Sequence, residues 1–220
     1  MKVDKFRTVI IYIIIILLGL VCLLPLLNIV AISFSSSAAV EGNMVGLIPV
    51  GFSTAAYKKI LEDSQFWHSF LISVERVVLT LIINFVLIVL MAYPLSKTNA
   101  QFRGRNIYAN LMIFAMLFNG GMIPTFLLVK SYGLLNTVWA LVLPGAVPIF
   151  NVILVMNFFA AVPKELEEAA FIDGANPLQV LTKIFIPISK PVLATVSLFS
   201  IVGSWNDFYS GLIYMSKATR

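Results

Sequence analysis

The chain has 220 residues, of which 60% are hydrophobic and 11% charged, and its mean hydropathy is +0.99. Soluble domains carry about 25% charged residues, so this composition excludes a soluble enzyme and predicts an all-α protein that crosses the bilayer several times. The net charge of +5 comes from Lys and Arg in short segments between apolar runs, a pattern that specifies membrane topology and argues against nucleic-acid binding.

The first predicted span covers residues 9–34, which contain no charged residue. At a rise of 1.5 Å per residue this run more than covers a hydrocarbon layer of about 30 Å. Lys2, Lys5 and Arg7 precede it, so residues 1–8 are predicted to be cytoplasmic. A cleaved signal peptide is the alternative, but the run is long and lacks a small-residue cleavage site, which favours a retained anchor.

The second predicted span covers residues 67–96, after a polar external loop at 35–66 with a short amphipathic helix around 55–61. Trp67 and His68 suit one membrane interface. Glu75 and Arg76 fall inside the apolar pattern, but the uncharged run 77–96 is long enough for both to lie near the outer edge. They are interpreted as an interfacial pair, with a substrate-pathway pair as the alternative.

The remaining predicted elements alternate across the membrane. With the N-terminus inside, more Lys and Arg fall on the inner side than outside, as the positive-inside rule expects. The ranges are a cytoplasmic loop at 97–105, a third span at 106–129, a fourth at 137–160, a cytoplasmic segment at 161–190, a fifth span at 191–214 and an external tail at 215–220. The transmembrane domain proper is predicted at 67–220.

Residues that could carry chemistry are scarce. Cys22 is the single cysteine and His68 the single histidine, which excludes a disulfide within the chain and a Cys-based or multi-histidine metal site. Cys22 is interpreted as a buried small hydrophobic residue and His68 as an interfacial polar residue. There is no GxxxxGK[ST] phosphate loop and no nucleophile–base pair, so neither an enzymatic activity nor a bound cofactor is predicted for this chain.

The cytoplasmic segment 161–190 differs from its surroundings because it is rich in acidic residues. Pro163 suits a first helical position, and Glu165, Glu167 and Glu168 load the positive end of the helix dipole. Gly174 suits the left-handed residue that ends a helix. A first short helix is therefore predicted between Pro163 and Gly174.

A second short helix is predicted directly after it. Asn176 suits the N-cap and Pro177 the next position, Lys183 lies toward the C-terminal end, and Pro187 is expected to stop the helix. Its apolar side would consist of Leu178, Leu181, Ile184 and Phe185. Two capped amphipathic helices suit a docking element, and the alternative is a pair of helices lying on lipid.

The same segment resembles the EAA signature of bacterial ABC-importer permeases, EAA-x3-G-x9-I-x-L-P. The one departure is Ile186 where Leu is usual, and Asp173 lies in an IDGA string common in the sugar-importing branch. The matching residues are Glu168, Ala169, Ala170, Gly174, Ile184 and Pro187.

Other stretches extend the resemblance over nearly the whole chain. Residues 92–96, 163–166 and 205–208 resemble maltose-type permeases, and residues 119–125 resemble the subgroup that imports oligosaccharides from degraded plant or algal polysaccharides, including uronate-containing ones. The resemblance implies the type I ABC-importer permease fold. That family usually has six spans, so five predicted spans suggest that the last is missing from this sequence.

In such permeases the EAA loop forms coupling helices that insert into a cytoplasmic ATPase subunit. The resemblance implies that Glu168 bonds with the ATPase, that Ala169 and Ala170 permit close approach, and that Gly174 makes the turn. Asp173, Ile184 and Pro187 complete the coupling set. The implied partners are a second homologous permease, two ATPase subunits that bind ATP and Mg, an extracellular solute-binding protein and membrane lipid, in the bacterial cytoplasmic membrane.

A substrate path is predicted at a break in the third span. Gly120, Gly121 and Pro124 interrupt the apolar run, and broken helices often mark translocation pathways. Asn119 and Thr125 could then bond with sugar hydroxyls, although a kink used for packing is the alternative. Three further asparagines are interpreted as links between helices rather than ligand sites: Asn84, Asn151 and Asn157.

Two other functions compete with an ABC permease for oligosaccharides. An ion-gradient-driven secondary transporter would need acidic residues within the membrane, and only Glu75 and Asp207 are candidates, both mapped near the outer surface. A non-transporting scaffold would not need a two-helix docking element. Association with an ATP-hydrolysing subunit separates these hypotheses.

Overall fold

The computed structural model describes residues 5–215, and side chains from Thr8 onward. Throughout this range the chain forms helices and loops and no strand, which confirms the all-α prediction. The chain divides into two units, residues 1–70 and 71–220, which are described separately. Predictions that rest on Lys2, on the side chains of Lys5 and Arg7, or on residues 216–220 lie outside the described residues.

The first unit begins with α1 (Lys5–Ser33), which contains Pro25. Its apolar side chains are exposed all round the helix, and residues 8–33 are long and apolar enough to cross a membrane. A helix without a polar face suits lipid on every side. Cys22 is therefore exposed on this helix, and its prediction as a buried residue is wrong for this chain.

The segment after α1 folds back onto the end of that helix. Asn28 Nδ2 donates to the carbonyl oxygen of Gly46 at 2.7 Å, and the Phe34 ring stacks on Phe52 with centroids 5.7 Å apart. Two short helices follow, α2 (Ser37–Glu41), which was not predicted, and α3 (Ala55–Glu62), which was. The polar interval is thus an ordered loop.

The second unit is built along α4 (Ser64–Leu95), which begins in the first unit and corresponds to the second predicted span. Its buried positions recur every three or four residues and include Thr80, Asn84, Ile88 and Ala92, whereas side chains on the other side, such as that of Ile82, are exposed. One face of α4 therefore packs against the chain, and the other suits lipid.

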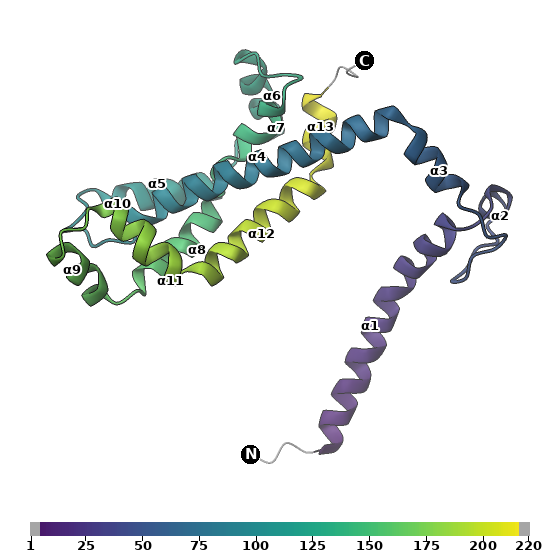
Figure 1. The fold of residues 1–220 in the computed structure, drawn as a ribbon, viewed down its shortest axis with the longest axis horizontal. Coiled ribbons are helices and arrows are strands. Elements are labelled where there is room, and N and C mark those ends of the chain that lie inside the picture. Colours follow the sequence, from purple (N-terminus) through teal and green to yellow (C-terminus); the bar gives the residue numbers. More distant parts are fainter. Residues whose placement is uncertain (1–4, 216–220) are drawn as a thin grey trace. The chain divides into compact units, whose positions relative to one another are not determined.

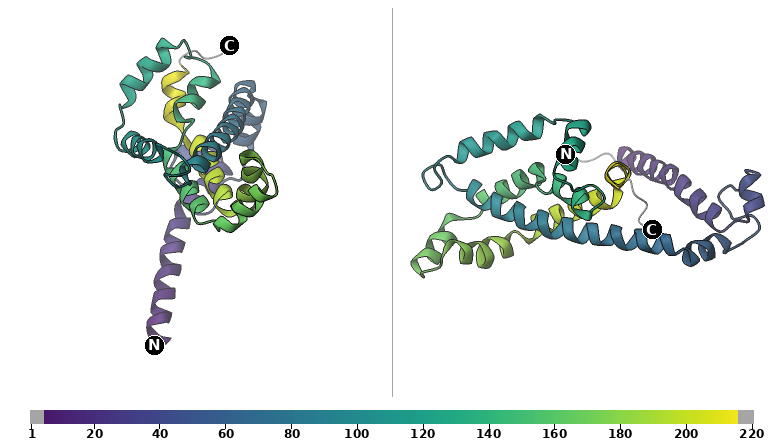
Figure 2. Two further views of the ribbon diagram at one scale, coloured as in Figure 1. Left: turned by 90° about the vertical axis from the view of Figure 1, so that its left-hand side faces the viewer. Right: turned by 90° about the horizontal axis from the view of Figure 1, so that it is seen from above.

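Each of the other predicted spans is interrupted. The third comprises α5 (Arg105–Leu117) and α6 (Met122–Ser131), bent by 112°, and the fourth comprises α7 (Val138–Val142), a 3₁₀ turn (Leu143–Gly145) and α8 (Ile149–Ala160), bent by 48°. Figures 1 and 2 show α6 turned away from α5. The fifth comprises α12 (Lys190–Asn206) and α13 (Phe208–Tyr214). A break in the third span was predicted, whereas the breaks in the fourth and fifth spans were not.

Local residue chemistry accounts for the first two breaks. Gly121 has φ +88°, a backbone region that favours glycine, and Pro148 caps α8, where its missing N–H costs nothing. By length and composition, the described residues contain two helices able to cross a membrane, or up to five spans if each bent pair crosses as one. The third of these pairs joins residues 177–188 to α12, so the number and bounds of the five spans stay a prediction.

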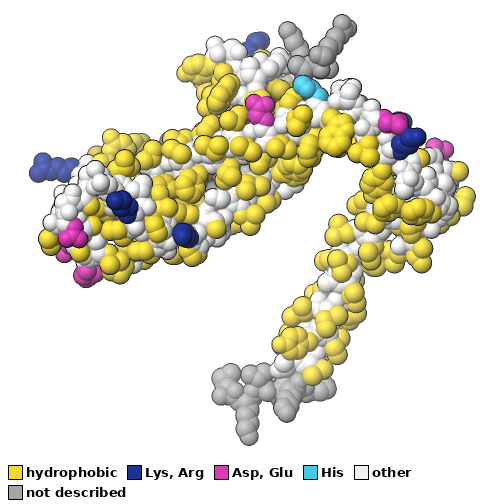
Figure 3. Space-filling view, in the orientation of Figure 1, with side chains coloured by type: hydrophobic (Ala, Val, Ile, Leu, Met, Phe, Trp, Pro, Cys, Tyr) yellow, Lys and Arg dark blue, Asp and Glu magenta, His cyan; other side chains and the backbone are white. Residues whose placement is uncertain are grey.

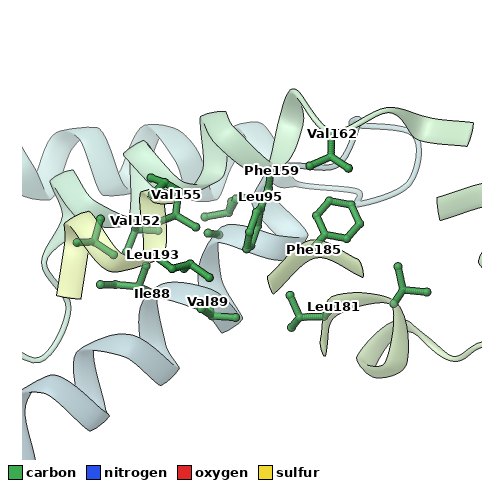
Figure 4. Packing of buried hydrophobic residues seen from close by; sticks show 14 of the residues in the cluster. Ile88, Val89, Leu95, Val152, Val155, Phe159, Val162, Leu181, Phe185 and Leu193 are labelled. Carbon is green, nitrogen blue, oxygen red and sulfur yellow. The ribbon is translucent and has the colours of Figure 1, made fainter. Parts of the chain in front are cut away.

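The core of the second unit lies between α4, α8 and α12 and reaches the segment after α9 (Figure 4). α8 contributes Val152, Val155 and Phe159, which are almost fully buried. The Phe159 ring meets Phe185 edge to face, with centroids 5.4 Å apart. α12 runs beside α4 (Figures 1 and 2), and the two are linked by a hydrogen bond between Asn84 and Ser200 (3.2 Å).

Replacing Phe159 by Ala is expected to destabilise this core by roughly 3–5 kcal/mol, because the change removes a buried ring and leaves a cavity. Thermal unfolding in detergent would show a lower Tm for Phe159→Ala. Phe150→Ala on the same helix is the matched control, because Phe150 is 61% exposed. Equal Tm values for the two variants would contradict this packing.

Candidate functional site

Residues 161–190 form a helical segment at one end of the second unit. It contains α9 (Lys164–Ile172), α10 (Pro177–Val180), a π-helical turn (Leu181–Phe185) and α11 (Ile186–Ile188). Charged side chains gather at this end, whereas the sides of the long helices are mostly hydrophobic (Figure 3). The two-helix element predicted from the sequence is therefore present.

The caps of this segment are those that the sequence indicates. Gly174 has φ +80°, and the Ala175 N–H donates back to the Ala170 carbonyl at 2.9 Å, which ends α9. Asn176 Oδ1 accepts from the Gln179 N–H, and Gln179 Oε1 accepts from the Asn176 N–H, each at 2.9 Å. This reciprocal capping box was missed, although Gln179 three residues after Asn176 is its sequence signal.

Three local predictions are corrected. Pro163 is the N-cap of α9 rather than its first residue. Pro187 does not stop the second helix, because the helical path continues through the π turn and α11, and the chain bends by 84° around Ser189. Leu178 is 62% exposed, so it does not share the buried face that Leu181 and Phe185 form.

The predicted coupling residues divide between surface and core. Ala170 and Ile184 are half-buried against the core cluster. We call the exposed members, together with Ile172, the EAA surface: Glu168, Ala169, Ile172, Asp173, Gly174 and Pro187. Ile172 is 86% exposed, so almost none of its apolar side chain is covered by the rest of the chain. The EAA surface is thus free to meet another protein.

Glu167, next to Glu168, points the other way and forms an ion pair. Its carboxylate lies 2.7 Å from Lys97 Nζ, with the two side chains only 11% and 12% exposed. The same ammonium lies 4.1 Å from the centroid of the Tyr93 ring and 4.2 Å from that of Phe185. This cluster was not predicted. Glu167 was expected only to favour the helix dipole, and Lys97 only to mark the cytoplasmic side of the membrane.

A second ion pair corrects the interpretation of Glu75 and Arg76. Arg76 is 8% exposed. Its Nη1 donates to the Asp207 backbone oxygen at 2.9 Å and its Nη2 pairs with the Asp207 carboxylate. The other carboxylate oxygen of Asp207 caps α13 by accepting from the Ser210 N–H at 3.1 Å. Glu75 is exposed, because consecutive helix residues do not share a face.

A polar cavity of about 410 Å³ lies beside this second pair. Its polar groups come from Thr80, Asn84, Asn151 and Ser204 and from the Arg76–Asp207 pair, and apolar side chains such as that of Phe199 line the rest. Arg76 Nε and Thr80 Oγ1 are buried without a hydrogen-bond partner among the described residues. Asn84 links α4 to α12 as predicted, whereas Asn157 is exposed on α8.

The predicted substrate-path residues lie elsewhere, at the break between α5 and α6. Asn119 Oδ1 accepts from the Gly121 N–H at 2.9 Å, and Thr125 Oγ1 donates to the Gly121 carbonyl at 2.8 Å. Both polar side chains therefore stabilise the break itself. Gly120 and Gly121 interrupt the helix as predicted, but Pro124 lies in the first turn of α6 and interrupts nothing. None of these residues lines the polar cavity.

A metal centre has no basis in the described residues. No group of three or more His, Cys, Asp or Glu side chains in residues 5–215 is close enough to hold an ion.

Comparison with known proteins decides the family. Residues 48–218 match the family described as "Binding-protein-dependent transport system inner membrane component". The chain belongs to this family. The predicted resemblance to ABC-importer permeases is thereby confirmed, and the chain is an inner-membrane permease component of an ABC transporter.

Individual members of the binding-protein-dependent permease family are similar over most of this chain. Protein LplC of Bacillus subtilis (strain 168) is 44% identical over 202 residues, 92% of this chain and 68% of the relative. The polygalacturonan/rhamnogalacturonan transport system permease protein YtcP of the same organism is 41% identical over 217 residues, 99% of this chain and 75% of the relative.

A solved structure supports the same fold. A chain in the crystal structure of a bacterial ABC transporter involved in the import of the acidic polysaccharide alginate is 34% identical, with a TM-score of 0.91. The match covers 99% of this permease-family chain and 77% of that chain. The predicted subgroup, which resembles importers of polysaccharide-derived oligosaccharides, is confirmed by these relatives.

Replacing Arg76 by Met is expected to destabilise the second unit by about 2 kcal/mol, because Asp207 would lose its cation while remaining partly in contact with water. Thermal unfolding in detergent checks the effect. Glu75→Gln is the matched control, since it removes a charge from the exposed neighbour. A Tm for Arg76→Met equal to that of Glu75→Gln would show that the ion pair contributes nothing.

Proposed function

We propose that this permease forms half of the translocation pathway for oligosaccharides derived from acidic polysaccharides, and that its EAA surface couples that pathway to a cytoplasmic ATPase. ATP and Mg are bound, and ATP is hydrolysed, by the partner ATPase. A second homologous permease, two ATPase subunits and an extracellular solute-binding protein complete the transporter.

The observation that carries the coupling role is the exposure of the EAA surface on a capped pair of helices. Glu168 supplies a charge, and Ile172 and Leu178, which are 86% and 62% exposed, supply apolar contacts. Ala169 and Gly174 have no bulky side chain to hold a partner at a distance. A charged group beside exposed apolar groups on a rigid helical element suits a protein partner better than water or lipid.

The orientation follows from the same surface. An ATPase that binds cytoplasmic ATP can meet residues 161–190 only on the inner side of the membrane, which places the N-terminus inside as the positive-inside rule predicts. In this arrangement the polar cavity beside Arg76 lies toward the outer half of α4, about 30 Å from the inner end of the helix at Leu95 at a rise of 1.5 Å per residue.

The relatives support an acidic substrate class, and the cavity supports a sugar as the solute. One relative is named for polygalacturonan and rhamnogalacturonan transport, and the similar structure is of an alginate importer. Alginate and polygalacturonan are polymers of uronic acids. The cavity offers hydroxyl, amide and guanidinium groups, which suit sugar hydroxyls, and its Arg76 charge is already balanced by Asp207.

The Arg76–Asp207 ion pair argues against a gradient-driven secondary transporter. Such a protein needs an acidic residue that can exchange its counter-ion within the membrane. Glu75 is exposed, and Asp207 is already bound to Arg76 and to the start of α13. A non-transporting scaffold would not need the exposed EAA surface.

Glu168→Lys and Gly174→Pro are expected to reduce association with the ATPase and to uncouple ATP hydrolysis from uptake, while membrane insertion persists. The first variant reverses the charge of the EAA surface. The second introduces a residue whose φ near −65° is incompatible with the +80° of Gly174. Co-purification of the ATPase with the assembled transporter measures the effect.

Glu62→Lys is the control for that experiment, because it makes the same charge reversal at an exposed glutamate on α3. It should leave the amount of co-purified ATPase unchanged. Normal ATPase binding and normal uptake by both EAA-surface variants would refute the coupling role.

Thr80→Val and Asn151→Leu are expected to slow uptake of a labelled galacturonate trimer several-fold in proteoliposomes that contain the whole transporter and its binding protein. Each variant removes a hydrogen-bonding group from the cavity, and co-purification of the ATPase should not change. Asn119→Ala tests the alternative path at the α5–α6 break. Slower uptake with Asn119→Ala, and normal uptake with both cavity variants, would move the pathway to that break.

A further inference from the structure

Lys97 lies at a point where four parts of the second unit meet. Its ammonium contacts Glu167 of α9 and the face of Tyr93 at the end of α4, at 2.7 Å and 4.1 Å. It also lies 4.2 Å from the ring centroid of Phe185 in the π turn. Phe185 in turn meets Phe159 of α8 and Tyr93, with ring centroids 5.4 Å and 5.1 Å apart. We call the group Lys97, Glu167, Tyr93 and Phe185 the Lys97 joint.

The attachment of α9 depends on this joint to an unusual degree. Glu167 is the only buried residue in Lys164–Ile172, and most of the other side chains of α9 are exposed. A helix in a protein is normally held by a stripe of buried apolar residues. α9 instead has one buried charged side chain, with Ala170 half-buried beside it.

Adjacent residues of α9 lie on different faces of the helix. Glu168 is exposed on the EAA surface, whereas Glu167 points inward to Lys97. Apart from the chain connections to α8 and α10, Glu167 is therefore the one buried side chain through which a force applied to α9 reaches α4. Because the ion pair is nearly buried, water does not screen it as it would at a surface.

The geometry of the Lys97 joint also permits α9 to rotate without separating from α4. The ammonium is a compact, nearly spherical charge, and two aromatic rings hold it by cation–π contacts while the carboxylate pairs with it. α9 can tilt about such a contact and stay tied to α4, whereas interdigitated apolar packing would resist tilting.

We propose that the Lys97–Glu167 pair is the positioning element that transmits movement of α9 to α4 when the ATPase subunits close. This inference rests on the proposed coupling function and assigns its mechanical link within the chain. Lys97 and Glu167 touch neither nucleotide nor sugar. They act by fixing the distance between α9 and α4.

The test measures that distance in the assembled transporter with both permeases and both ATPase subunits. Spin labels are placed by Glu165→Cys on α9 and Ile82→Cys on α4, both at exposed positions, in a Cys22→Ser background with the other subunits free of cysteine. Electron–electron double resonance is recorded without nucleotide and with Mg-ATP and vanadate. With Lys97 and Glu167 intact, we expect one narrow distance distribution that is the same in both states.

Lys97→Met is expected to broaden that distribution and to shift it when Mg-ATP and vanadate are added, because α9 then moves without α4. ATP hydrolysis should continue while its stimulation by the binding protein is lost. Lys97→Arg keeps the cation and should restore the narrow distribution. Lys58→Met is the control for loss of a lysine, since Lys58 pairs with Glu62 at the surface, where the side chains are 77% and 67% exposed.

If Lys97→Met does not assemble, Glu167→Gln carries the test, because it keeps the shape of the side chain and removes only the charge. An unchanged narrow distribution in Glu167→Gln or Lys97→Met, in both nucleotide states, would overturn the joint. Loss of the ATPase from the complex in which Lys97 and Glu167 are intact would instead refute the proposed function. Retention of the ATPase together with unchanged distances would refute the joint alone.

Discussion

A buried charge on or beside an apolar helix must be paired, and this constraint organises the second unit. Arg76 on α4 and Lys97, just after the end of α4, flank an uncharged run long enough to cross the hydrocarbon layer. Leaving either cation unpaired in a low dielectric would cost several kcal/mol. Each is paired with an acid from the C-terminal part of the chain, Asp207 for Arg76 and Glu167 for Lys97. Two ion pairs thus tie α4 to distant segments, one at each end.

The two ends of this uncharged run differ in their surroundings. Beside Arg76, the break between α12 and α13 leaves a polar cavity whose lining groups can accept and donate hydrogen bonds. Beside Lys97, the segment 161–190 packs through Phe185 onto the apolar core and exposes the EAA surface. The core between them is continuous through α8 and α12, so it can carry movement from one end to the other as a rigid body.

The weak attachment of α9 suits the difference between the two ends. Elements that move during function are drawn from regions with few buried apolar contacts, and Glu167 is the only buried residue of α9. An apolar stripe would fix α9 to the core more firmly, but it would leave fewer side chains for a partner. A single buried charge keeps the helix in place and leaves the rest of its surface available for binding.

The sequence by itself determined the membrane class, the segment that belongs to the EAA signature and the caps at Gly174 and Asn176, because apolar composition and capping depend on a residue and its near neighbours. Only the tertiary structure decided that Arg76 pairs with Asp207, 131 positions away, and Lys97 with Glu167, 70 positions away. It also decided that Glu167 is buried while Glu168 is exposed, and that Asn119 and Thr125 stabilise a break rather than line the polar cavity. These features depend on how helices pack in three dimensions, and no periodicity along the chain specifies which distant residues will meet.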